Sequence, residues 1–409
     1  MEIKLLKQKL VYLAKNVSSY IMGLFYGRTK RNVLLGAWMG MKFADNSRYL
    51  FQYLSDRKEE FGLKNVIWAT RNEDVDKLLK SMGYKSCMIG TAESRKWHLK
   101  SGIHIICNTA FPLEKFDTDI DTRFSFGALK IQLWHGVGFK AVGMTSNDAK
   151  SNKRHTILKH ISSLKIFSPI KSFGGWTEAK VVATSPQNGI ALQKVTGCRA
   201  DRIVLTGYPR HCECPKLLRS EKEVISKITG MGRSIMYVPT FRSNVNNYSH
   251  PLTYRPLVDY LNENNILWIE KPHSADEHYK STDYGVNHLL LLESSFDINV
   301  IYSYASAVIS DYSSAVFDSI RMNIPVIMYT PDIEDFKHGD VGFLFDVEDY
   351  CSSLISYNQE SCLDMLNEVF TDNYFNCQRK ETFDKICKDF FVSSKNSISD
   401  IWIDLTAEK

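Results

Sequence analysis

Short apolar runs alternate with longer amphipathic segments along the chain from Asn32 onward. The runs are apolar on both faces, which is typical of central parallel strands covered by helices. The first series of expected strands comprises Val33–Ala37, Val66–Thr70, Ile103–Cys107, Ile131–Trp134, Lys165–Phe167, Val181–Thr184 and Ile203–Thr206. The second series comprises Ile235–Val238, Ile266–Ile269, Leu289–Leu292, Ala307–Ile309 and Val326–Tyr329. This strand–helix alternation predicts an α/β protein with mostly parallel sheets.

A polar stretch, Pro215–Arg233, separates the two series of strands. A chain of 409 residues also exceeds what one hydrophobic core usually serves. We therefore expect two Rossmann-like domains that face each other across a cleft and bind ligands at the carboxyl ends of their strands. The predicted division is an amphipathic helix over 1–31, one domain over 32–210, a second over 211–390 and a helical tail over 391–409.

The first 31 residues carry a strong positive charge bias. Glu2 is the one acid among the basic residues Lys4, Lys7, Lys9, Lys15, Arg28, Lys30 and Arg31. Leucines and other apolar residues recur there near a helical period, so the segment reads as a basic amphipathic helix. Such a helix lies on an anionic membrane surface or packs on the protein's own core. The chain shows no secretory signal and no apolar run long enough to span a bilayer.

The composition excludes several classes of protein. At 44% hydrophobic and 24% charged residues, the chain is neither disordered nor collagen-like. The excess of five positive charges is too small to indicate a nucleic-acid partner. Nine cysteines are too sparse for a disulfide framework and fit a reducing cytosol. The pair Cys212 and Cys214 could bind a soft metal, but no second Cys/His pair follows at zinc-site spacing, so free thiols are favoured.

A histidine follows the expected strand Ile131–Trp134. Because His135 precedes a glycine-bearing turn, its imidazole is presented at the carboxyl edge of the strand, where it could accept a proton near neutral pH. The alternative is a structural turn with a capped histidine. Gly136 and Gly138 also mimic a dinucleotide fingerprint. The acid that such a site needs about twenty residues later is missing, so a nicotinamide cofactor is disfavoured.

Cationic and hydroxyl side chains follow three strands of the second series. Arg242 follows the strand Ile235–Val238, and Lys271 and His273 follow Ile266–Ile269. Ser313 and Ser314 stand between a buried strand and a helix, beside free backbone N–H groups. Converging strand ends of this kind would clamp a diphosphate. Taken singly, each residue could instead be a helix N-cap or a surface ion pair.

An acidic triplet lies in a polar stretch between strands. Asp117, Asp119 and Asp121 resemble the Asp-x-Asp metal motif of another class of nucleotide-sugar transferases. A solvated acidic loop is the favoured interpretation. No metal site and no cofactor are therefore expected.

Five ordered blocks over residues 129–346 resemble the CDP-glycerol glycerophosphotransferase family of teichoic-acid primases and polymerases. The blocks are Trp134-His135-Gly136 with Lys140, Thr206-Gly207-Tyr208-Pro209-Arg210, Pro239-Thr240-Phe241-Arg242, Lys271-Pro272-His273, and Asp297-Ile298-Asn299 leading to Ser310-Asp311-Tyr312-Ser313-Ser314 with Phe317-Asp318. Gly342-Phe343-Leu344-Phe345-Asp346 is similar to the family's closing segment. The fold implied is the two-Rossmann arrangement of GT-B glycosyltransferases.

The resemblance implies an enzyme in which an acceptor hydroxyl attacks the β-phosphorus of a CDP-activated polyol and releases CMP. It implies His135 as the general base in the acceptor domain. The implied pyrophosphate ligands in the donor domain are Arg242, Lys271, His273, Ser313 and Ser314. The implied supporting residues are Asp311, Asp318, Arg210, Lys140 and Gly136.

The same resemblance implies the partners and location. The donor is CDP-glycerol or CDP-ribitol, and the acceptor is lipid-linked or polymeric, in teichoic-acid or capsular polymer synthesis. A cytoplasmic enzyme attached peripherally to the inner face of the membrane through residues 1–31 fits that acceptor. Departures from the family pattern at Val137, His211, Ser243 and Ser274 leave the polyol open. Two alternatives also remain: a GT-B glycosyltransferase using a nucleoside-diphosphate sugar, and a non-catalytic nucleotide-binding scaffold.

Overall fold

A computed structural model of the chain describes residues 14, 18, 20–108, 118–142, 145, 176–213, 215–240, 248–272, 282–339 and 341–407. The chain divides into two compact units. The first comprises the described residues of Met1–His135, Lys153–Lys216 and Ser393–Lys409, and the second those of Gly136–Asn152 and Leu217–Val392.

The first unit is built on a parallel sheet whose strand order in the described residues is β3-β2-β1-β4-β5-β6-β7. The strands are β1 (Thr29–Leu35), β2 (Asn65–Thr70), β3 (Lys85–Met88), β4 (Ser101–Ile106), β5 (Leu129–Gln132), β6 (Lys180–Ala183) and β7 (Ile203–Leu205). The helices are α2 (Asp45–Asp56), α3 (Glu73–Ser81), α4 (Ala92–Lys100), α8 (Pro186–Thr196) and α16 (Ile398–Thr406). Every residue of β2, β4 and β6 is buried, which explains why apolar runs in the sequence predicted these strands.

The second unit holds a parallel sheet with the order β10-β9-β8-β11-β12-β13. Its strands are β8 (Ser234–Val238), β9 (Leu267–Glu270), β10 (Leu289–Leu291), β11 (Ala307–Ser310), β12 (Val326–Tyr329) and β13 (Ile355–Ser356). Its helices are α9 (Arg219–Met231), α10 (Arg255–Glu263), α11 (Ala315–Arg321), α12 (Ile333–His338), α13 (Val347–Cys351), α14 (Gln359–Phe370) and α15 (Cys377–Phe391). Two parallel α/β units confirm the expected fold class.

Local sequence signals fix several helix ends. Ser185 accepts the backbone N–H of Asn188 at the start of α8, where Pro186 occupies the first turn. Gly197 ends the same helix with a φ of 71°, a left-handed conformation that glycine adopts without strain. Asn72 caps α3 in the same way, by accepting the N–H groups of Asp74 and Val75.

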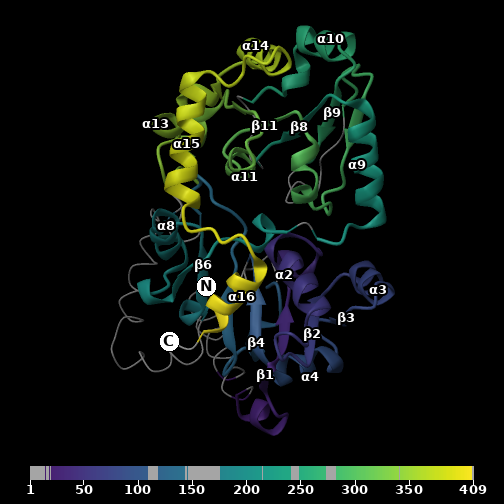
Figure 1. Cartoon of the computed structure of the whole chain (residues 1–409), viewed down its shortest axis with the longest axis vertical. Coiled ribbons are helices and arrows are strands. Elements are labelled where there is room, and N and C mark those ends of the chain that lie inside the picture. The colour runs from purple at the N-terminus through teal and green to yellow at the C-terminus, as the bar shows by residue number, and fades with distance from the viewer. Residues whose placement is uncertain are drawn as a thin grey trace, which may run out of the picture. The chain divides into compact units, whose positions relative to one another are not determined.

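The unit boundaries depart from the sequence-based division. Residues 136–142, expected in the first domain, belong to the second unit. The C-terminal segment, expected as a separate tail, belongs to the first, and Figure 1 shows the yellow helix α16 among the blue and teal elements of that unit. The Nζ of Lys180 donates to the carbonyl oxygens of Leu405 and Ala407 at 2.9 and 2.8 Å, which ties α16 to β6.

The N-terminal helix expected over 1–31 does not reach residue 31. In the described part, the helical residues end at Phe25, and β1 begins at Thr29. Gly27 turns the chain with a φ of 68°. Arg28, counted among the basic residues of the expected helix, is half-buried and donates to the carbonyl oxygens of Leu99, Phe126 and Phe124. Most of residues 1–19, and the strand expected at Lys165–Phe167, lie outside the described residues.

No helix of the described residues combines the length and the apolar character needed to cross a bilayer.

Candidate functional site

His135 lies three residues beyond the end of β5 and is half-buried. Its Nδ1 is 3.4 Å from the carbonyl oxygen of Cys107, the residue that follows β4. Because a carbonyl can only accept, this contact favours the tautomer with the proton on Nδ1. Nε2 then carries the lone pair and can take a proton from a hydroxyl.

Two tryptophans surround the imidazole. The ring of Trp134 stacks on it at 4.7 Å, and the ring of Trp38 lies at 6.2 Å. Both tryptophans have left-handed backbones, with φ of 61° at Trp134 and 48° at Trp38. Such conformations are costly for large side chains and persist where the surrounding structure enforces them, as happens at functional sites.

Asp119 supports the loops beneath this histidine. Its carboxylate accepts the backbone N–H groups of Met39, Cys107 and Asn108 at 2.9, 3.0 and 2.7 Å. The residue is fully buried, so these contacts replace the hydration that the carboxylate loses. Gly36 permits the close approach of this loop, because a Cβ there would overlap the carbonyl oxygen of Asp119.

The interpretation of Asp119 and Asp121 as part of a solvated acidic loop is therefore wrong. Asp121 is also buried, and it pairs with Arg123 at 2.6 Å. Backbone donors and a guanidinium occupy the two carboxylates, while Asp117 lies outside the described residues. Within the described ranges, no group of His, Cys, Asp and Glu side chains has the arrangement of a metal site.

Arg210 joins the histidine loop to α2. Its Nη1 forms an ion pair with Asp45 at 2.6 Å and donates to the carbonyl oxygen of His135 at 3.0 Å. The Pro209-Arg210 block thus contacts the Trp134-His135 block directly, although the two are far apart in the sequence.

The candidate donor site lies at the carboxyl ends of three adjacent strands of the second unit. Lys271 follows β9, Thr240 follows β8, and Ser313 and Ser314 follow β11. Since β9 and β11 both pair in parallel with β8, these residues share one edge of the sheet. Arg242 and His273 lie outside the described residues.

Lys271 is a buried cation at this edge. Its exposed fraction is 8%, and burial lowers the pKa of its ammonium, partly offset by the charge of Asp297. A buried ammonium in this state gains stability from an anionic ligand.

The loop after β11 is held by its own polar side chains. Asp311 accepts the backbone N–H of Thr240 with both carboxylate oxygens, at 3.0 and 2.9 Å. Ser313 accepts the N–H of Ala315 at 3.3 Å, as expected of a residue at the start of α11. Ser313 and Ser314 are half-buried, whereas Asp318 is buried.

Gly136 and Lys140 belong to the second unit, although His135 belongs to the first. Lys140 forms an antiparallel bridge with Phe343, and the N–H of Ala141 donates to the carbonyl oxygen of Gly342 at 3.0 Å. The Phe139 ring packs on Phe317 at 4.6 Å. Two of the blocks that resemble the family are therefore in direct contact.

Sequence reasoning missed Trp38, Asp45 and Asn46, and it misread Asp119. No charge cluster or motif marks them, because each acts through a backbone group or a ring that only the folded chain brings to the histidine.

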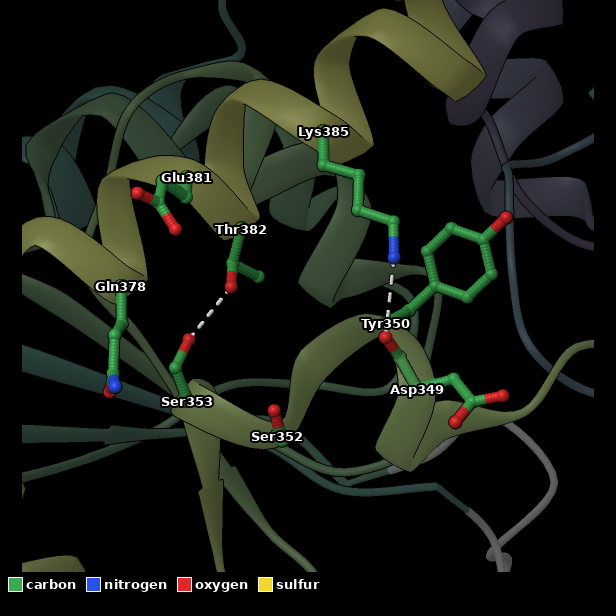
Figure 2. A pocket seen from close by; sticks show the side chains of 8 residues that line it. All are labelled: Asp349, Tyr350, Ser352, Ser353, Gln378, Glu381, Thr382 and Lys385. Carbon is green, nitrogen blue, oxygen red and sulfur yellow. Dashed lines mark hydrogen bonds between the residues drawn. The ribbon is translucent and has the colours of Figure 1, made fainter.

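A separate open pocket of about 470 Å³ lies between α13 and α15 of the second unit (Figure 2). Lys385 lies over the ring of Tyr350 at 4.5 Å and donates to the carbonyl oxygen of Asp349 at 3.3 Å. The pocket includes none of the predicted site residues. Its two carboxylates, Asp349 and Glu381, outnumber its one ammonium, so it is poorly suited to a diphosphate.

Two parallel α/β units with polar side chains at their strand ends are the architecture expected of a transferase of the GT-B type. A model of the CDP-Glycerol:Poly(glycerophosphate) glycerophosphotransferase family matches residues 20–397, and the chain belongs to this family.

Relatives and solved structures agree with that membership. The chain is 23% identical over 378 residues to the teichoic acid poly(glycerol phosphate) polymerase of Bacillus spizizenii, covering 88% of this chain and 89% of the relative. It is 23% identical over 382 residues to the teichoic acid glycerol-phosphate transferase of Staphylococcus aureus, with coverage of 88% and 89%. The structure of the wall teichoic acid polymerase TagF shares the fold, with a TM-score of 0.67 at 16% identity, covering 99% of this chain and 97% of that chain.

Proposed function

We propose that this enzyme transfers a polyol phosphate, glycerol phosphate in the first instance, from a CDP-polyol to a hydroxyl of a lipid-linked or polymeric acceptor. His135 is the general base of this reaction. The observation that carries the role is the contact of its Nδ1 with the Cys107 carbonyl, since it leaves Nε2 able to accept a proton.

In the proposed step, Nε2 of His135 takes the proton of the acceptor hydroxyl while the oxygen attacks the β-phosphorus of the donor. A new phosphodiester bond forms, the bond from the β-phosphorus to the bridging oxygen breaks, and CMP leaves with that oxygen. This chemistry needs positioning and neutralisation of spread phosphoryl charge more than covalent participation of the protein.

The donor diphosphate is bound by Lys271, Ser313 and Ser314, together with Arg242 and His273. The buried ammonium of Lys271 supports this assignment, because a phosphate oxygen would supply the counter-charge at that sheet edge. Asp311 supports the binding loops by holding the N–H of Thr240, two residues before Arg242. Asp318, Lys140, Gly136 and Arg210 complete the proposed set as supporting residues.

Residues 1–31 are proposed to bring the enzyme to the inner face of the membrane, where a lipid-linked acceptor is found. Supporting this, Ile21, Leu24 and Phe25 at the end of the N-terminal helical stretch are 52, 66 and 86% exposed. Apolar side chains beside basic residues suit an anionic lipid surface.

The test is CMP release by the purified enzyme with CDP-glycerol or CDP-ribitol and a synthetic glycerophosphate lipid. We expect CMP as the nucleotide product, with turnover of the His135→Ala variant reduced by about 10²–10⁴-fold. Release of a nucleoside diphosphate from a sugar donor would instead identify a glycosyltransferase. Near-normal CMP release by His135→Ala would remove His135 from the role of base.

A further inference from the structure

A buried ion pair lies directly behind the candidate base. The side chains of Arg210 and Asp45 are 2 and 4% exposed, and their contact joins residues that are 165 positions apart. The same Nη1 that pairs with Asp45 donates to the carbonyl oxygen of His135 at 3.0 Å. The guanidinium therefore links the carboxylate of α2 to the backbone of the histidine.

Asn46 makes a second link to the same backbone. Its Nδ2 donates to the carbonyl oxygen of Trp134 at 2.8 Å, and its Oδ1 accepts the backbone N–H of Arg210 at 3.3 Å. The two successive carbonyls of Trp134 and His135 are thus each held by a side chain. Asn46 is fully buried, so these bonds do not compete with solvent.

The backbone of this region is under strain that other contacts must offset. Asp45 and Trp134 have φ of 63° and 61°, in the left-handed region that non-glycine residues seldom adopt. A buried ion pair also costs desolvation, and replacing such a pair with apolar residues is often neutral or stabilising. Strain and buried charge where the start of α2 meets the segment after β5 indicate a demand for precise geometry there.

The His135 segment lies where the chain passes from the first unit to the second. His135 is the last residue of its segment in the first unit, and Gly136 begins a segment of the second unit with a φ of 148°. Fixing the carbonyls of Trp134 and His135 keeps the imidazole in place relative to Cys107, whatever the segment after Gly136 does.

We propose that Asp45, Asn46 and Arg210 form a positioning clamp for the general base. The clamp fixes the peptide groups on both sides of His135 so that Nδ1 stays on the Cys107 carbonyl and Nε2 stays directed at the acceptor hydroxyl. This inference rests on the proposed function of His135. None of the three residues touches the substrates in this role; they act through the histidine.

The experiment compares three clamp variants, Asp45→Asn, Arg210→Lys and Asn46→Ala, with a matched control. Asp121→Asn is the control, because it removes the charge of a buried carboxylate of the same unit whose ion pair, with the partly exposed Arg123, does not include the Trp134-His135 backbone. Because misplacement of a catalytic group by about 1 Å can cost about 10²-fold, we expect kcat to fall by about 10–10²-fold in the clamp variants. The Kd for CDP, which the second unit binds, should stay at the wild-type value.

A spectroscopic measurement separates positioning from general loosening of the fold. Imidazole ¹⁵N shifts report which nitrogen carries the proton, and the His135 signals are those lost in His135→Ala. We expect the wild-type protein to show the Nδ1-protonated form and the clamp variants to show mixed tautomers. Asp121→Asn should keep both the spectrum and kcat of the wild type.

The outcomes distinguish the clamp from the function on which it rests. Wild-type kcat and an unchanged His135 spectrum in all folded clamp variants, with His135→Ala inactive, would overturn the clamp and leave the proposed base in place. An active His135→Ala would instead remove the base itself. If the two variants of the ion pair, Asp45→Asn and Arg210→Lys, fail to fold, Asn46→Ala decides, since it leaves no buried charge unpaired.

Discussion

The carboxylate of Asp311 accepts the backbone N–H of Thr240 with both of its oxygens, at 3.0 and 2.9 Å. The two residues follow adjacent strands, β11 and β8, so this contact joins the ends of neighbouring strands at the edge that carries Lys271. Asp311 itself is buried, and both of its carboxylate oxygens are engaged by this backbone N–H. The carboxylate therefore holds the backbone at Thr240, two residues before Arg242 in the sequence.

Replacing Asp311 should therefore weaken donor binding more than it changes the chemistry. A hydrogen bond to a charged group contributes about 1.5–3 kcal/mol, so Asp311→Ala should raise the KM for the CDP-polyol about tenfold or more. Steady-state CMP release measured over a range of donor concentrations gives both KM and kcat. A rise in KM confined to the donor supports the assignment.

The control for this prediction is Asn358→Ala in the same unit. Asn358 accepts one backbone N–H, that of Ser361, at the start of α14. Loss of that cap should lower stability by about 1 kcal/mol without changing the donor KM. If both variants raise the donor KM equally, Asp311 has no particular role in the donor site.

Much of the sheet architecture was predictable from apolar runs, and the exceptions have a physical cause. Strands such as β2 and β4 are buried along their whole length and carry Val and Ile, so their sequences are distinctive. The strand β3 reads Lys-Ser-Cys-Met and lies at the edge of its sheet, where burial on both faces is not required. The strand β13 has two residues, too few to form a pattern.

The site was less predictable than the sheets. The position of His135 just after a strand could be inferred from its sequence neighbourhood, but the strand ends at Gln132, earlier than expected. Asp119 sits among other acids in a polar stretch, where composition favours solvent exposure. Its burial depends on backbone N–H groups from Met39 and Cys107, which are distant in sequence. Such contacts have no sequence signature because any residue can supply a backbone N–H.

Asp119 is expected to support both the fold and the base. Asp119→Ala leaves three N–H groups without their acceptor, one of them buried and two partly buried, and the loss of an acceptor for a buried group costs about 1–3 kcal/mol. Urea unfolding should show a loss of about 3 kcal/mol or more. Asp119→Asn keeps one acceptor oxygen, so its free energy of unfolding should lie between those of Asp119→Ala and the wild type. Equal stability of Asp119→Ala and wild type would mean that the three bonds contribute nothing.

Two buried histidines should make the first unit sensitive to acid. His98 donates from Nδ1 to the Ser94 carbonyl and accepts the Asp121 N–H at Nε2, so the ring is bonded as the neutral form. His104 likewise pairs with Ser125 and the His98 carbonyl. Burial lowers the pKa of His98 below its ordinary value of 6.5 and that of His104 well below it.

Because both pKa values are lowered in the folded state, the unfolded chain binds more protons in acid. The contribution of the two neutral histidines to the free energy of unfolding is therefore fully present above about pH 6.5. It is lost as the pH falls below that value, by about 1.4 kcal/mol per pH unit for each extra proton that the unfolded chain binds. Urea unfolding at neutral and mildly acidic pH, monitored through hydrogen exchange of the β4 amides, measures how the free energy of unfolding depends on pH. His104→Gln should reduce the slope, whereas the exposed His338→Gln should not. A slope that His104→Gln leaves unchanged would contradict the assignment.

Donor affinity should depend on pH through Lys271. Burial lowers the pKa of its ammonium below the ordinary value of 10.5, so the lysine loses its proton at a lower pH than an exposed lysine does. The proposed diphosphate site uses the charged form of Lys271. The affinity for CDP should therefore fall as the pH rises toward that lowered pKa. Calorimetric titration of CDP from about pH 7 to about pH 9.5 tests this direction.

Two variants of Lys271 separate charge from packing. Lys271→Met keeps the apolar stem but removes the charge, so CDP binding should weaken about tenfold or more near pH 7, and the difference from the wild type should shrink as the pH rises. Lys271→Arg keeps a charge that does not titrate in this range, so its affinity should be lower than that of the wild type but independent of pH. A pH profile of Lys271→Met that still falls like that of the wild type would assign the titration to another group and place the diphosphate away from β9.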